Sequence, residues 1–273
     1  MGPIRKPVVA GQFYPALRDE LRFMIEGYLD KAQKIQIPGK IKALIVPHAG
    51  YVYSGQTAAW GYKQLQKIQI PKSLPGRQAG KFQNHFVLIG PSHQYPFENL
   101  IADDHEAWET PLGQVRHQLP KKKKDLVQIS GEPHQNEHCL EVQIPFLQVT
   151  SYKPQVTGFL TGTQVDIVGA AEYLRAEFPE STYIISTDLS HYLPMVQASK
   201  ADMETVKAIE RKDADYFFRE GNTACGRWGV AVILAMAQKL NWGVQVIHYE
   251  TSASAFGDTG RVVGYLSAAI YEI

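Results

Sequence analysis

The chain has 273 residues, with 28 Lys and Arg against 27 Asp and Glu, 44% hydrophobic residues and only two cysteines. These values are ordinary for a globular protein and exclude a disordered, collagen-like, coiled-coil or disulfide-framework chain. A formal net charge of +1 provides no field that would attract nucleic acid. The longest apolar run, residues 229–237, is far shorter than the roughly 20 residues that a membrane helix needs, and residues 1–7 lack the apolar stretch that is typical of a signal peptide. We therefore expect a cytoplasmic protein without nucleic-acid or membrane partners.

Short apolar runs alternate with segments of three-to-four apolar spacing along the chain. The predicted strands are residues 43–46, 86–89, 156–160, 183–186, 244–247 and 262–266. The predicted helices are residues 54–67, 137–150, 164–178, 199–213 and 226–240. A stretch rich in Pro, Gly and Lys at residues 71–80 predicts a loop insertion.

The alternation of strands and helices predicts an α/β fold with a central, mostly parallel sheet that is flanked by helices. The last two extended segments, residues 243–251 and 261–271, leave no room for a helix between them and are expected to be antiparallel. No linker or repeat is visible, so we expect one domain over residues 1–273.

Histidines follow three of the predicted buried strands. His48, His93 and His191 come shortly after the runs at 43–46, 86–89 and 183–186. In open α/β sheets ligands bind in the crevice outside the carboxyl ends of the strands. A lone loop histidine is more often a surface or structural residue, but the shared placement makes these three candidates for one site. Asp188 precedes His191 by three residues and is a candidate to orient it.

Cys225 lies immediately ahead of the predicted helix 226–240. Unpaired amides at a helix N-terminus stabilise a thiolate, and Arg227 would add to this effect. The competing interpretation is that Cys225 is a small buried hydrophobic residue. Cys139 is expected to pack in the predicted helix 137–150, whereas Glu137, His138 and Glu141 of that helix would supply acid, base or supporting groups.

Two chemistries remain open for these residues. Imidazoles and a thiolate suit iron(II), copper or zinc, although the wide spacing of the candidate ligands disfavours a closed structural zinc site. Alternatively, Cys225 and His191 would form a thiol and its base, with Asp188 as the orienting residue of a cysteine hydrolase.

Five ordered motifs, with a sixth near the N-terminus, resemble the MEMO family, which in bacteria and archaea is the AmmeMemoRadiSam system protein B. The motifs are VVAGQFYP (8–15), PHAGYVYSG (47–55), LIGPSH (88–93), EHCLEVQIPF (137–146), STDLSHY (186–192) and ACG (224–226). The resemblance implies a fold similar to that of class III extradiol dioxygenases, which cleave catechol rings with non-haem iron(II).

By the family pattern, His48 and His93 are the two histidine ligands and Cys225 takes the place of the third, which is a Glu in the dioxygenases. His191, with Asp188 beside it, matches the dioxygenase acid/base. A thiolate in place of a carboxylate changes the redox behaviour of a metal, so ring cleavage does not follow from the resemblance.

The resemblance thus implies an iron(II) or copper pocket, with zinc as a third candidate, and redox or dioxygenase-like chemistry on an unidentified small molecule. The name of the bacterial system also implies association with a radical SAM protein and an AMMECR-type protein. The alternative from another functional class is a non-catalytic metal-binding or peptide-interaction module with a dioxygenase-like pocket.

Overall fold

All six predicted strands and all five predicted helices have counterparts in the computed structural model, which describes residues 3–66, 85–219 and 224–273. The predicted insertion at residues 71–80 lies outside these ranges. The strands are β1 (Ile4–Arg5), β2 (Lys40–Val46), β3 (His85–Pro91), β4 (Leu100–Ala102), β5 (Ala107–Thr110), β6 (Gly113–His117), β7 (Val127–Ile129), β8 (Gln155–Thr161), β9 (Thr182–Ser186), β10 (His191–Leu193), β11 (Gly243–Thr251) and β12 (Val262–Glu272). The helices are α1 (Arg18–Lys31), α2 (Tyr51–Leu65), α4 (Ile144–Thr150), α5 (Ile167–Glu177), α6 (Met195–Glu210), α7 (Tyr216–Arg219), α8 (Arg227–Lys239) and α9 (Ala253–Phe256).

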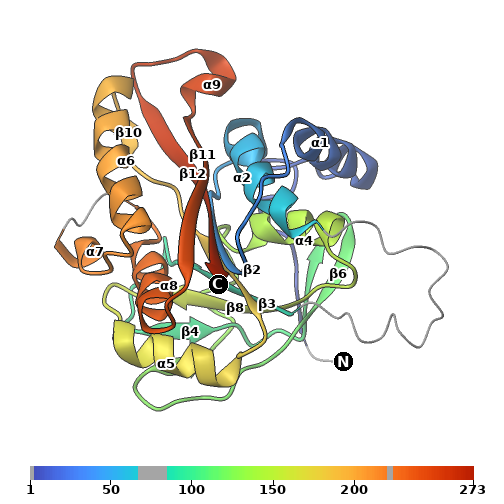
Figure 1. The fold of residues 1–273 in the computed structure, drawn as a ribbon. Helices are drawn as coiled ribbons and strands as arrows, with labels where there is room; N and C mark the ends of the chain where they lie inside the picture. Colours follow the sequence, from blue (N-terminus) through green and yellow to red (C-terminus); the bar gives the residue numbers. More distant parts are fainter. Residues whose placement is uncertain (1–2, 67–84, 220–223) are drawn as a thin grey trace.

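The strands form one mixed sheet at the centre of a single α/β domain (Figure 1). Its middle strands, in the order β8, β3, β9 and β2, are parallel to one another. The closing pair β11 and β12 is antiparallel, as predicted, and β12 also runs antiparallel to β2. The predicted fold class, a mostly parallel mixed sheet flanked by helices, is therefore confirmed.

Period-two alternation in the central strands explains why helices cover both faces of the sheet. In β2, Ala43 and Ile45 face the core cluster that contains α5 and α8, whereas Leu44 and Val46 face the cluster that contains α1, α2 and α4. All four side chains are fully buried. Figure 1 shows these two helical layers on opposite sides of the strands. Because helices cover both faces of the sheet, a site can form at the carboxyl ends of the parallel strands.

The predicted helix at 137–150 is wrong at its start. A 3-10 helix occupies Glu141–Gln143 and the α-helix begins only at Ile144. The reason is local, because the carboxylate of Glu137 accepts hydrogen bonds from the backbone N–H groups of His138 and Cys139 and holds them outside a helix.

Helix α9 lies at the tip of the β11–β12 hairpin, above the main body of the sheet (Figure 1). Among the helices in the described ranges, none combines the length and the apolar character that crossing a membrane requires.

Candidate metal centre

The predicted strand-end residues meet at one edge of the sheet. Strands β3, β9 and β2 are neighbours, with Ile89 opposite Ile185 and Val46 opposite Ser186. Each strand then leads within a few residues to a histidine, so the loops that carry His48, His93 and His191 begin side by side.

Three of the predicted residues bring their ligand atoms together. Nitrogen atoms of His48 and His93 and the sulfur of Cys225 all lie within 4.8 Å of one another. The Cys225 Sγ is 3.2 Å from the Nε2 of His48, and the centroids of the two imidazole rings are 5.3 Å apart. Two imidazoles and a thiolate at this spacing fit a transition-metal ion with coordination positions left open for other groups.

Hydrogen bonds with the two residues that follow β9 place Cys225 in the centre. The N–H of Asp188 donates to Cys225 Sγ at 3.2 Å, and the N–H of Cys225 donates to the carbonyl of Asp188 at the same distance. The next residue, Gly226, donates its N–H to the hydroxyl of Thr187 at 2.9 Å. These bonds anchor the turn before α8 against the end of β9.

The thiol of Cys225 is neutral without a bound cation. Burial, with the negative charge of Asp188 as a smaller cause, raises its pKa to about 12. Arg227 lies over the ring of Trp228, 4.6 Å from its centroid. Hydrogen bonds from the backbone N–H groups of Asp188 and Gly226 lower this pKa, in the direction expected for a helix N-terminus, but burial outweighs them. A metal ion is the kind of charge that would produce the thiolate.

A carboxylate supports His93. Its Nδ1 is 2.9 Å from Glu137 Oε1, and its backbone N–H donates to Glu137 Oε2 at 2.7 Å. Burial alone would raise the pKa of Glu137, but the hydrogen bonds and charge of His93 outweigh it and lower that pKa to about 2. Burial lowers the pKa of His93, and Glu137 in turn raises it above its usual value. An ionised carboxylate behind the imidazole is typical of metal-binding histidines.

Asp188 and His191 differ in burial and in their contacts. The Asp188 carboxylate is buried and accepts a hydrogen bond from the backbone N–H of His48 at 2.8 Å. His191 is exposed at the start of β10 and lines the same cavity as His48 and His93. The imidazole that contacts the Cys225 sulfur is that of His48, so the predicted thiol and base pair of Cys225 with His191 does not match this geometry.

A cavity of about 770 Å³ opens in front of these residues. Its inner lining includes His48, His93, His138, Asp188 and His191. Its lining also includes the exposed rings of Tyr53, Tyr192 and Phe256 and the charged residues Asp258 and Arg261. Arg261 lies over the ring of Tyr192 at 5.2 Å. The cavity is large enough for a small organic molecule.

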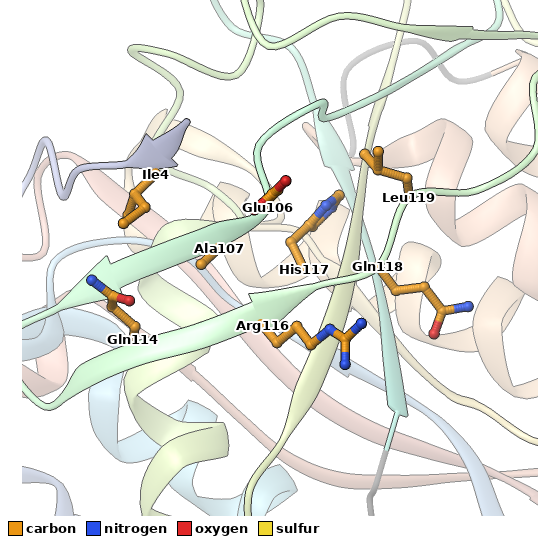
Figure 2. Close-up of a pocket in the computed structure, with 8 residues that line it drawn as sticks. All are labelled: Ile4, Glu106, Ala107, Gln114, Arg116, His117, Gln118 and Leu119. Carbon is orange, nitrogen blue, oxygen red and sulfur yellow. The ribbon is translucent and has the colours of Figure 1, made fainter. Parts of the chain in front are cut away.

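A second cavity, of about 650 Å³, lies over β5 and β6 (Figure 2). It contains none of the predicted site residues. Its histidine, His117, accepts a hydrogen bond from the backbone N–H of Gly158 at 2.9 Å through Nε2. This bond gives His117 a structural role between β6 and β8.

Two further groups of residues have side chains that can bind a metal ion, but these side chains form hydrogen bonds within the protein. Asp103 bonds to the His105 ring at 2.6 Å and to the Trp108 indole. The group of His93, Glu137 and His138 is built around the carboxylate that already supports His93. Cys139 is fully buried and donates to the carbonyl of Pro91, so its predicted packing role is confirmed.

Sequence reasoning missed two residues behind His48. Ser186 lies 2.9 Å from His48 Nδ1, and Gln143 donates to the Ser186 hydroxyl at 2.8 Å. The available signal was weak, because each is a single uncharged polar residue at the end of, or within, an apolar run.

Comparison with known proteins gives similarity over nearly the whole chain. A family model described as Memo-like protein matches residues 5–269. A MEMO1 family protein of Thermotoga maritima is 35% identical, with 98% of this chain and 99% of that protein covered. MEMO1 family proteins of Thermoplasma volcanium and Nitrosopumilus maritimus are each 31% identical, covering 97% and 96% of this chain and 97% and 98% of their own lengths.

Proposed function

Because the chain belongs to the Memo-like protein family, we propose that its strand-end pocket is a non-haem metal centre for redox chemistry on a small substrate. His48, His93 and Cys225 bind iron(II) or copper, with zinc as the third candidate. One observation carries the proposal. The three ligand atoms lie within 4.8 Å of one another, while Nδ1 of His48 is hydrogen-bonded to Ser186 and Nδ1 of His93 to Glu137.

The roles of the chain's own residues follow from their positions. Iron(II) or copper would supply electron transfer and polarise a bound substrate. His191, exposed on the cavity wall, passes a proton to or from the substrate. Asp188 holds the backbone of His48 through its carboxylate and so acts as a positioning residue. The exposed aromatic rings in the cavity lining favour a substrate with a flat apolar surface.

Metal content after anaerobic purification tests the ligand assignment. We expect about one equivalent of metal in the wild type and less than a tenth of that in the double variant His48→Ala/His93→Ala, because Cys225 alone is a weak site. The control is His85→Ala, since His85 lies at the opposite end of β3 and bonds to Ser181 and Thr157. A double variant that retains full metal content would overturn the assignment.

A second function is favoured by the exposed rings of Tyr53, Tyr192 and Phe256 at the mouth of the cavity. Exposed apolar side chains around a cavity are typical of interaction sites. In this alternative the protein is a non-catalytic metal-binding or peptide-interaction module. Oxygen consumption by the metal-loaded protein with catechols and other small aromatics separates the two functions, because a binding module would show no rate above that of the free metal.

A further inference from the structure

A fully buried polar chain lies behind His48. It runs from Tyr62 through Gln143 and Ser186 to the His48 ring, and each of these side chains is at most 2% exposed. The pairing of β9 with β2 sets Ser186 opposite Val46, which places its hydroxyl beside the loop that carries His48. Buried polar groups are costly unless they are hydrogen-bonded, so the direction of each bond can be worked out.

The Ser186 hydroxyl has one proton and can therefore donate one hydrogen bond, which goes to a backbone carbonyl. Its Oγ lies 2.7 Å from the backbone carbonyl of Cys139, which is an acceptor only, so Ser186 donates to it. The Oγ must then accept from both of its other neighbours, Gln143 Nε2 at 2.8 Å and His48 Nδ1 at 2.9 Å. It follows that His48 carries its proton on Nδ1.

The orientation of the Gln143 amide is fixed in the same way. Its Nε2 also lies 2.9 Å from the carbonyl of Pro47, another pure acceptor, and its Oε1 accepts from the Tyr62 hydroxyl at 2.9 Å. Rotating the amide by half a turn would set its oxygen against the Pro47 carbonyl. Gln143 therefore donates to the Ser186 hydroxyl, and that hydroxyl cannot donate to Gln143 in return.

We infer that Ser186, held by Gln143, is the positioning residue that keeps the proton of His48 on Nδ1 and turns the Nε2 lone pair toward Cys225 and the metal. The position of the His48 proton follows from the hydrogen bonds alone. Its role in metal binding rests on the proposed function. The lone pair of Nε2 is what a metal requires, and Nε2 is the atom 3.2 Å from Cys225 Sγ. His93 is supported differently, by the charged carboxylate of Glu137.

The first measurement uses the metal-free wild-type protein. Nitrogen-15 NMR of the histidine rings at pH 7.5 distinguishes a proton on Nδ1 from one on Nε2. We expect the His48 proton on Nδ1. A proton on Nε2 overturns the inference without any variant, so the test does not depend on how a substitution folds.

The second measurement compares Ser186→Ala with Ser181→Ala. Ser181 is a matched control, because it pairs with the ring of His85 at 2.6 Å next to the opposite end of β9. In Ser186→Ala we expect a His48 population with the proton on Nε2 and a zinc dissociation constant raised roughly 10- to 100-fold in a competition titration. In Ser181→Ala the His48 signals and the zinc affinity stay as in the wild type.

The outcomes separate the two proposals. Ser186→Ala with an unchanged His48 ring state, or with zinc affinity within twofold of a wild type that binds zinc, overturns the inference, as does an equal effect in Ser181→Ala. A wild type that binds none of iron(II), copper and zinc overturns the proposed function. The NMR comparison in the metal-free proteins then still decides whether Ser186 sets the ring state.

Discussion

His48 and His93 hold similar places but have different supports. Ser186 is a neutral partner for His48, and burial keeps the pKa of His48 well below its usual value. Glu137 is a charged partner for His93 and raises the pKa of His93 although burial opposes it. A carboxylate partner makes an imidazole a stronger electron donor. The two histidines are therefore expected to be unequal ligands, with His93 the stronger donor.

Replacing Glu137 by Gln tests the charge of this support in the metal-free protein. Because the pKa of Glu137 is lowered from 4.5 to about 2, its ionised form stabilises the fold above pH 4.5, and this stabilisation is lost as the pH falls toward 2. The shift corresponds to about 3 kcal/mol. Urea denaturation across this range should show the wild-type free energy of unfolding falling by about that much more than that of Glu137→Gln. Parallel curves for the two proteins would contradict the role assigned to this carboxylate.

At the scale of elements, the site depends on how α8 begins against the end of β9. Gly226 makes this approach possible. A Cβ at this position would lie 2.5 Å from the carbonyl oxygen of Ser186 and 2.8 Å from the Cβ of Thr187. Neither neighbour is the flexible end of a long side chain, so the turn that carries Cys225 would have to move.

We therefore predict that Gly226→Ala lowers the free energy of unfolding by about 1–3 kcal/mol and weakens zinc binding. Gly27→Ala is the control, because Gly27 lies within α1 and a Cβ there meets nothing within 4 Å. Alanine in a helix is favoured over glycine by roughly 0.5–1 kcal/mol, so the control should be slightly stabilised. Chemical denaturation and a zinc competition titration measure both effects. A Gly226→Ala protein as stable as the wild type would show that the turn can relax at no cost.

The elements nearest the site were the most predictable ones. Strands β2, β3 and β9 are continuous apolar runs because helices bury both of their faces, and such runs stand out in a sequence. Strands β4 and β7 have three residues each and depend on pairing with partners that periodicity does not identify. Ser186 and Gln143 were missed for a similar reason, since their function is a hydrogen bond between segments 43 residues apart. Helix α1 was not predicted either, although its sequence does indicate a helix, with Leu21, Ile25 and Leu29 at four-residue spacing.

At the scale of the whole molecule, the centre joins segments from very different parts of the chain. His48 follows β2, His93 follows β3 and Cys225 precedes α8, so the three ligands come together only when the central sheet and α8 have packed. An unfolded chain would hold these ligands far apart. An ion at this site therefore binds the folded protein in preference to the unfolded chain and should stabilise the whole domain.

Free zinc at 100 times its dissociation constant should stabilise the fold by about 2.7 kcal/mol. For a domain of this size that is an increase in the thermal midpoint of about 5 °C. His48→Ala/His93→Ala should show no increase, whereas His85→Ala should keep it. Differential scanning calorimetry with and without zinc measures the shift. If the double variant were stabilised as much as the wild type, the ion would have to bind elsewhere.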